Sequence, residues 1–175
     1  YAPIHGWFHV ASGMFDTCLV IAEEKMSSAF PHPAGAFLTI FDHTTEQPLF
    51  PTLIWIFAIE MHRFMHRHGY KKEEIAQVAV KNKRNALDHP SAQLGAEITV
   101  EDVLNAEVVS YPLTELDIAP TSDGAVVVVL AAEDVAPSLS DLPVWIRGIG
   151  WCSDTPTLES RDWGSAVYAQ MAADM

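Results

Sequence analysis

An uninterrupted apolar run at residues 126–132 constrains this chain more than any other stretch. Its successive valines favour an extended backbone, and it lacks the polar–apolar alternation of a strand with one solvent-exposed face. The sequence therefore predicts a strand buried on both faces of a sheet. A polar segment at 119–125 leads into this strand, and its Gly124 would permit a positive φ or a close backbone approach. The same residue types are equally typical of a tight turn with a purely local role.

Helical and extended patterns alternate along the rest of the chain. An i, i+3, i+4, i+7 apolar stripe predicts a helix at 2–13, and a short buried strand follows at 17–22. Longer helices are predicted at 52–68 and 71–86, bounded by proline, glycine and acidic first-turn signals. We further expect a short helix at 100–105 capped by Thr99, an extended segment at 108–116, a strand at 144–151 and a helix at 163–175. This order indicates the α/β class.

Two stretches read as connections. Prolines and aromatic residues crowd residues 27–51, which predicts a long irregular excursion of the kind that usually covers a site or has a function of its own. Residues 137–143 read as a linker. The helix after the excursion is apolar on most faces at its start, so we expect that part to be buried or to form an interface.

Charge and length exclude several classes of protein. The net charge of −13 over 175 residues argues against binding to nucleic acid or to an anionic membrane surface. No apolar stretch approaches the roughly 18 residues of a membrane span, and no basic region of a signal peptide is visible. Cytoplasmic location is the default expectation. The chain begins at Tyr1 and stops within a predicted helix at Met175, so we expect a segment of a longer protein.

Histidine and cysteine residues give no strong chemical signal. His62 and His66 are four residues apart, but no glutamate follows the first of them and no acidic or thiol ligand completes a set, so we predict no metal site. Cys18 lies in an apolar run, where a buried thiol is inert. Cys152 has no histidine nearby in the sequence. We interpret both cysteines as structural.

The dense basic cluster consists of Lys81, Lys83 and Arg84 at the end of a predicted helix. In an acidic protein such a patch could hold a phosphate group against the overall field. The alternative interpretation is a solvated helix face.

Four groups of residues, in order along the chain, resemble the thiolase superfamily in its sterol-carrier-protein-type and archaeal branches. They are residues 11–14 with Asp16 and 24–27; residues 78–85 with Pro90 and 98–104; Pro112, Leu113 and Asp117; and residues 120–125. Each group alone is a weak signal. Their common order over residues 10–135 makes the resemblance specific.

The resemblance implies a fold and a domain organisation. Thiolases have two similar α/β halves that pack as a five-layered αβαβα fold, with a loop domain inserted in the first half over the coenzyme A site. By resemblance, residues 1–136 would be the N-terminal half, with the loop domain at about 27–122. Residues 143–175 would begin the C-terminal half.

The resemblance also implies an activity. The family condenses acyl-CoA units or cleaves the product by thiolysis, with a cysteine that takes the acyl group and histidine and a second cysteine that move protons. Coenzyme A enters as a substrate, and no permanently bound cofactor is implied. Neither Cys18 nor Cys152 matches a catalytic position, so the catalytic residues are expected outside this segment. The segment alone is expected to be inactive.

Site residues and partners follow from the same resemblance. Ala119, Thr121 and Ser122 would contact the pantetheine arm of acyl-CoA, and Lys81, Lys83 and Arg84 could approach its nucleotide phosphates. Residues 37–57 would shape the acyl pocket. The family is usually a homodimer or homotetramer, and the helix at 2–13 would lie near that interface.

Two alternatives remain open at this point. Some thiolase-like chains are retro-aldolases on CoA-linked side chains, or acyltransferase subunits that work with a small zinc-ribbon and OB-fold partner protein. The other alternative is a non-catalytic structural subunit whose apolar helical stretch at 52–61 serves assembly. The residue at the nucleophile position upstream would discriminate the aldolase, which need not keep a cysteine there. Absence of any catalytic cysteine or histidine in the full-length gene would favour the structural subunit.

Overall fold

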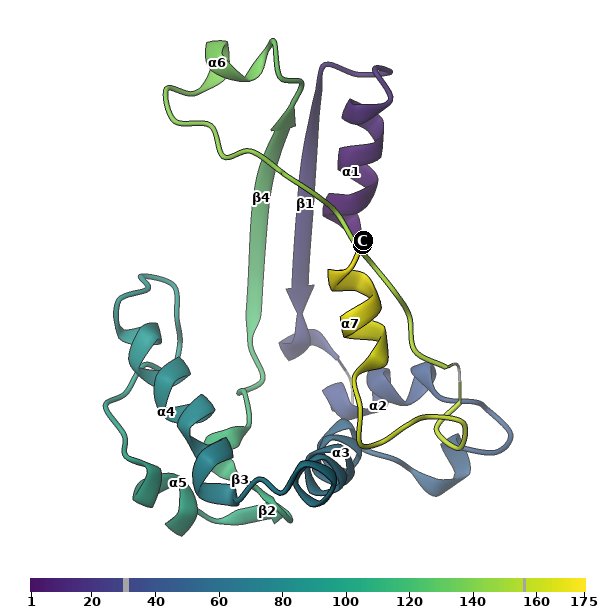
Figure 1. The fold of residues 1–175 in the computed structure, drawn as a ribbon, viewed down its shortest axis with the longest axis vertical. Coiled ribbons are helices and arrows are strands. Elements are labelled where there is room, and N and C mark those ends of the chain that lie inside the picture. The colour runs from purple at the N-terminus through teal and green to yellow at the C-terminus, as the bar shows by residue number, and fades with distance from the viewer. Residues whose placement is uncertain (30–31, 156) are drawn as a thin grey trace. The chain divides into compact units, whose positions relative to one another are not determined.

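The computed structural model describes residues 1–29, 32–155 and 157–175, and the chain divides into two compact units (Figure 1). Unit 1 contains Tyr1–Ser28, Ser122–Cys152 and Tyr168–Met175. Unit 2 contains Ala29–Thr121 and Ser153–Val167. Helices and strands both occur, as the predicted α/β class requires.

Unit 1 is built on an antiparallel strand pair. Strand β1 (Thr17–Lys25) lies beside β4 (Asp123–Ala131), with Thr17 opposite Ala131 and Lys25 opposite Asp123. Both predicted strands are therefore present, and they pair over nine residues each. The two strands are about 100 residues apart in the sequence, so their pairing joins the two distant segments of the chain that make up most of unit 1.

Helix α1 (Ala2–Ala11) packs on one face of the ladder, as Figure 1 shows. Gly6 permits the close approach, because a Cβ atom built on it would lie 2.5 Å from Val20 Cγ2 and 3.0 Å from Leu130 Cδ1. The helix ends at the predicted place, where Gly13 adopts the left-handed conformation with φ +72°.

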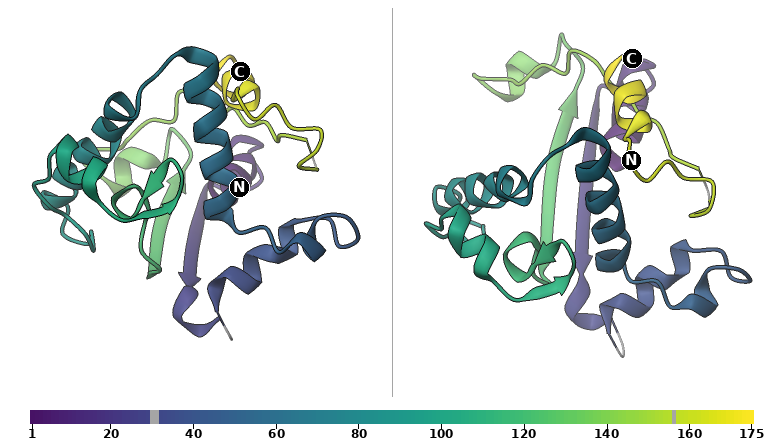
Figure 2. Two further views of the ribbon diagram at one scale, coloured as in Figure 1. Left: turned by 90° about the horizontal axis from the view of Figure 1, so that it is seen from below. Right: turned by 60° about the horizontal axis from the view of Figure 1, so that its bottom comes forward.

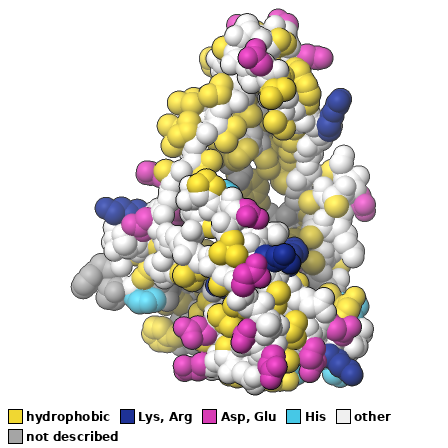
Figure 3. Space-filling model, turned by 90° about the vertical axis from the view of Figure 1, so that its left-hand side faces the viewer, with side chains coloured by type: hydrophobic (Ala, Val, Ile, Leu, Met, Phe, Trp, Pro, Cys, Tyr) yellow, Lys and Arg dark blue, Asp and Glu magenta, His cyan; other side chains and the backbone are white. Residues whose placement is uncertain are grey.

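The prediction that the 126–132 strand is buried on both faces is wrong for this chain. Cross-strand register and alternation put Leu19, Ile21, Val127 and Val129 on the ladder face opposite α1. Each of these side chains is about 60% exposed. Hydrophobic side chains of this unit accordingly show as yellow atoms on the surface in Figure 3. Within the described residues the sheet has no third strand beside β1 and β4.

Gly124 also differs from its prediction. It lies inside β4 opposite Glu24, and a Cβ atom built on it would meet nothing within 4 Å. Neither a positive φ nor a close approach therefore requires glycine here. The strand begins at Asp123, three residues before the start of the apolar run at residue 126.

The C-terminal part of unit 1 is mostly irregular. A short helix α6 (Ala136–Leu139) follows β4, and α7 (Val167–Ala173) is shorter than the helix predicted at 163–175. The strand predicted at 144–151 is absent, although those residues are described. Val144 is 95% exposed, and an apolar run without a neighbouring backbone to bond to does not become a strand.

Unit 2 contains the two long helices that the sequence predicted, which can be followed in Figure 2. Helix α3 (Leu53–His68) begins after Thr52, whose Oγ1 accepts a hydrogen bond from Trp55 N at 3.2 Å, and ends at Gly69 with φ +74°. Helix α4 (Lys72–Leu87) begins where the Lys71 amide donates to the Glu74 carboxylate. None of the described helices is long and apolar enough to cross a membrane.

Shorter elements complete unit 2. Helix α5 (Val100–Asn105) has the predicted cap, in which Thr99 and Asp102 bond reciprocally. The extended segment predicted at 108–116 is a small hairpin of β2 (Val108–Ser110) and β3 (Leu113–Thr114). The excursion predicted at 27–51 starts in η1 (Met26–Ser28), which still belongs to unit 1. In unit 2 it contains α2 (Pro33–Phe37), η2 (Leu38–Ile40) and η3 (Gln47–Leu49), and its residues 30 and 31 lie outside the described part.

Candidate functional site

The predicted pantetheine-binding turn lies between η4 (Glu115–Asp117) and β4. Ala119 and Thr121 are exposed and Ser122 is half-buried, so their polar groups can meet a ligand. Thr121 is the last residue of that part of unit 2, and Ser122 is the first residue of unit 1 to follow it. The turn is therefore a covalent connection between the units.

The residues before the turn are anchored by Asp117. Its Oδ2 accepts hydrogen bonds from Thr114 N at 2.8 Å and Thr114 Oγ1 at 2.9 Å, and it forms an ion pair with Lys72 Nζ at 2.5 Å. The Asp117 side chain is only 5% exposed. Through Oδ2 this buried carboxylate holds η4 against the first turn of α4, and thereby sets the direction in which the turn leaves unit 2.

The residues after the turn are anchored by Asp123. Its carboxylate accepts hydrogen bonds from Ser27 N at 2.9 Å and from Ser27 Oγ at 2.5 Å. Both bonds hold the pKa of Asp123 below its usual range, and the bond from the Ser27 hydroxyl has the larger effect. The start of β4 is thus tied to the end of β1, and both ends of the turn have a side-chain anchor.

The predicted basic cluster lies at the other end of α4. With a rise of about 1.5 Å per residue, Lys81 and Arg84 lie roughly 14–18 Å along the helix from Lys72. Lys81 and Arg84 are three residues apart and share a face, whereas the half-buried Lys83 points from another. Arg84 Nε lies 3.7 Å from Glu97 Oε1, and both side chains are largely exposed. The structure therefore joins two of the three predicted cations on one surface.

The histidines of α3 have ring or backbone contacts. The His62 ring lies edge-on to Tyr111 at 5.6 Å between centroids, and His68 Nε2 lies 3.2 Å from the Gly164 carbonyl oxygen. No three His, Cys, Asp or Glu side chains of the described residues are grouped as metal ligands would be. Cys18 lies under α1, with its Sγ 3.4 Å from the position of a Cβ on Gly6.

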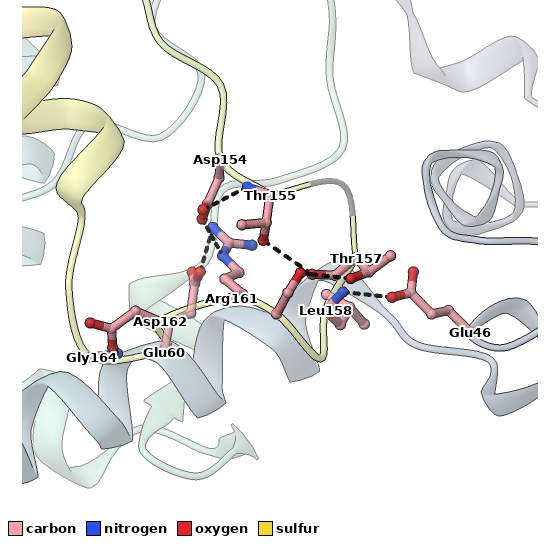
Figure 4. Close-up of polar contacts among 10 residues, drawn as sticks. Glu46, Glu60, Asp154, Thr155, Thr157, Leu158, Arg161, Asp162 and Gly164 are labelled. Carbon is pink, nitrogen blue, oxygen red and sulfur yellow. Dashed lines mark hydrogen bonds and ion pairs between the residues drawn. The ribbon is translucent and has the colours of Figure 1, made fainter.

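A polar cluster that the sequence did not reveal lies in unit 2 (Figure 4). Arg161 Nη2 pairs with Glu60 Oε1 at 2.6 Å, and Arg161 Nε pairs with Asp154 Oδ2 at 2.8 Å. Burial raises the pKa of Glu60. The positive charge of Arg161 partly offsets this increase, and the negative charge of Asp154 adds to it. Glu60 lies about 100 residues from its partner along the chain, so no local spacing could have indicated this cluster.

Comparisons with known proteins complete the description of the site. No protein-family model matches the chain. An acetyl-CoA acetyltransferase of Methanothermobacter thermautotrophicus is 35% identical over 156 residues, which are 89% of this chain and 40% of that protein. A benzoylsuccinyl-CoA thiolase subunit of Thauera aromatica is 36% identical over 53% of this chain and 24% of its own length.

A solved structure gives a matching fold. The Ltp2–ChsH2(DUF35) aldolase is similar with a TM-score of 0.66 and 25% sequence identity, over 92% of this chain and 43% of that one. The chain spans about two fifths of the length of the acetyltransferase and of the aldolase chain.

Proposed function

This chain belongs to the thiolase superfamily, and from that premise we propose that it is a segment of an acyl-CoA C-acyltransferase that forms or cleaves a carbon–carbon bond. The observation that carries the proposal is the 35% identity to an acetyl-CoA acetyltransferase along nearly nine tenths of the chain. The thioester activates the carbon next to its carbonyl and the carbonyl itself, which is the chemistry that such a reaction needs.

The proposal includes a domain organisation. We assign residues 1–136 to the N-terminal half of the fold, with the loop domain at about 27–122, and residues 143–175 to the start of the C-terminal half. The exposed apolar face formed by Leu19, Ile21, Val127 and Val129 supports the assignment, because such a face is stable when further strands and helices cover it. The relatives are long enough to supply them.

The segment's contribution to the reaction is substrate binding. The turn that carries Ala119, Thr121 and Ser122 is anchored on both sides and offers a hydroxyl and backbone groups to the amides of pantetheine. Lys81 and Arg84, with Lys83 beside them, offer positive charge to the phosphates. Coenzyme A is long and has its thiol and its phosphates at opposite ends, so one molecule could reach both groups.

Acyl transfer itself is assigned to residues beyond this segment. Cys18 lies half-buried in β1 beneath α1, where a thioester cannot approach freely. The chain should therefore bind coenzyme A without catalysing exchange or condensation. We expect the complete enzyme to be a homodimer or homotetramer that uses coenzyme A as substrate and keeps no permanently bound cofactor.

One observation favours a second candidate function. The structural neighbour is an aldolase named together with a DUF35 protein. We infer that a retro-aldolase, or an acyltransferase subunit that works with a small zinc-ribbon and OB-fold partner, is the alternative. Product analysis of the complete enzyme separates the two, since an aldolase releases an aldehyde or ketone whereas a thiolase consumes free coenzyme A.

A binding titration tests the proposal on this chain. The variant Lys81→Ala/Arg84→Ala should bind coenzyme A about tenfold more weakly than the unmodified chain at low salt, because charge-assisted contacts to phosphate are lost. Its affinity for pantetheine, which lacks the nucleotide, should stay the same. Lys71→Ala/Arg147→Ala is the matched control, since both of its positions are exposed and carry the same charge. Equal affinity of both double variants for coenzyme A would remove the cluster from the site.

A further inference from the structure

The loop of residues 157–164 lies alongside helix α3 and is joined to it by polar contacts (Figure 4). The contacts are Arg161 Nη2 with Glu60 Oε1 at 2.6 Å, Arg67 Nη1 with Asp162 Oδ1 and Oδ2 at 2.9 and 2.6 Å, and His68 Nε2 with the Gly164 carbonyl oxygen at 3.2 Å. Glu60 and Arg67 are seven residues apart and share a helix face, so the loop follows that face for about 10 Å.

A further contact fastens the start of the loop. Leu158 N donates a hydrogen bond of 2.5 Å to Glu46 Oε1, and Glu46 Oε2 accepts one from Asp42 N at 2.9 Å. Glu46 is one of the few buried polar residues, at 7% exposure. Opening of the loop would uncover this carboxylate.

The two arginines in these contacts are not equivalent. Arg67 and Asp162 are both more than half exposed, and an exposed ion pair contributes little to stability. Arg161 is only 20% exposed and bridges two carboxylates at once, Glu60 through Nη2 and Asp154 through Nε. The planar fork of a guanidinium makes this bridging possible, and a lysine ammonium has no such fork.

Removal of the cation and removal of a carboxylate should therefore have different effects. Without Arg161, two half-buried carboxylates would face each other with no positive charge between them, which is far more costly than the intact pairing. Without the charge of Glu60, Arg161 would still pair with Asp154, and the cluster would become neutral. Burial raises the pKa of Glu60 even though Arg161 is beside it, so the ionised form of Glu60 is destabilised within the cluster.

We propose that residues 157–164 form a strap that Arg161 latches onto α3, and that this strap opens as a unit, with α4 and α5 still folded, when the latch is removed. The proposal goes beyond the acyl-CoA function and does not depend on it, because every contact that supports it lies within unit 2. The strap would control exposure of Glu46 and of the middle of α3.

Hydrogen–deuterium exchange of the 175-residue chain tests the latch. The amides of Leu158, Arg161, Gly164 and Ser165 report directly, since each donates a hydrogen bond in or next to the strap. Arg161→Gln should raise their exchange rates by about tenfold or more, while amides of α4 and α5 keep their protection. Glu60→Gln and Arg67→Gln should change the same rates by less than about threefold.

Two controls keep the test decisive. Arg147→Gln removes the same charge at an exposed position of unit 1 and should leave the strap unaffected. Arg161→Lys keeps the charge but lacks the two separate nitrogens with which Arg161 contacts Glu60 and Asp154, so it should raise strap exchange to an intermediate degree. Equal exchange in Arg161→Gln and Arg67→Gln would overturn the proposal. If Arg161→Gln unfolds α4 as well, Arg161→Lys decides: a local increase supports the latch, and an unchanged strap refutes it.

Discussion

Asp117 and Lys72 form an ion pair of 2.5 Å that joins the last residue of η4 to the first residue of α4. Because the Asp117 carboxylate also accepts two hydrogen bonds from Thr114, one side chain holds three parts of unit 2 together. The candidate ligand-binding turn begins two residues further on, at Ala119. Its position therefore depends on a buried charge rather than on the turn's own residues.

Replacement of Asp117 should destabilise unit 2. Asp117→Ala leaves the Lys72 ammonium and the Thr114 amide without their partner in a site that is 5% exposed at the carboxylate, so we expect a loss of about 2–4 kcal/mol in the free energy of unfolding. Urea denaturation followed by circular dichroism measures it. Asp117→Asn retains an acceptor for Thr114 and should lose less. A loss below about 0.5 kcal/mol in both variants would show that this anchor is dispensable.

The anchor on the other side of the turn should depend on pH. The hydrogen bonds from Ser27 lower the pKa of Asp123 in the folded chain. A carboxyl group whose folded pKa lies below its unfolded value stabilises the fold above the unfolded pKa of about 4, and this contribution disappears as the pH falls through the folded value. Ser27→Ala should therefore be less stable than the unmodified chain at pH 7, and the difference should shrink at pH 3.

That comparison needs only unfolding curves at two pH values. Ser28→Ala is a fitting control, because the Ser28 hydroxyl bonds to the Lys25 carbonyl oxygen and not to a carboxylate, so its effect should not change with pH. A difference for Ser27→Ala that is constant from pH 7 to pH 3 would contradict the link to Asp123.

A methyl group at Gly6 should separate α1 from the strand pair. The Cβ of Gly6→Ala would lie 2.5 Å from Val20 Cγ2, so the helix or the valine must move, and overpacking of this kind costs about 1–3 kcal/mol. Alanine gains up to about 1 kcal/mol in helix propensity, so we expect a net loss of about 1 kcal/mol. Thermal denaturation measures the change, and Gly148→Ala, where a Cβ meets nothing within 4 Å, should be neutral.

Local signals predicted the helices of this chain well. Thr52 and Gly69 bound α3, Gly13 follows α1, and Thr99 with Asp102 opens α5, each through a cap that involves residues at most a few positions apart. The residues that carry the family resemblance also lie in short ordered groups. Helix caps and short motifs depend only on residues that are close together in the sequence, so they can be recognised without the tertiary structure.

The failures share a different cause. Residues 144–151 have the composition of a strand, yet they have no strand beside them among the described residues and stay irregular. The valines of β4 form a strand as predicted, but their burial depends on what covers the sheet. The composition of a segment indicates its preference for an extended backbone and its hydrophobicity. Strand pairing and burial also require another segment of the protein that packs against it.

The candidate site also has features that the sequence determined and features that only the structure determined. The sequence alone determined which residues carry hydroxyls at the turn and positive charge on α4, as well as the membership of the thiolase superfamily. Only the tertiary structure decided that Asp117 pairs with Lys72 and that Arg161 bridges Glu60 and Asp154. The Lys72–Asp117 and Glu60–Arg161 pairs, 45 and 101 positions apart, arise from packing, because the Coulomb attraction acts through space and leaves no periodic pattern along the chain.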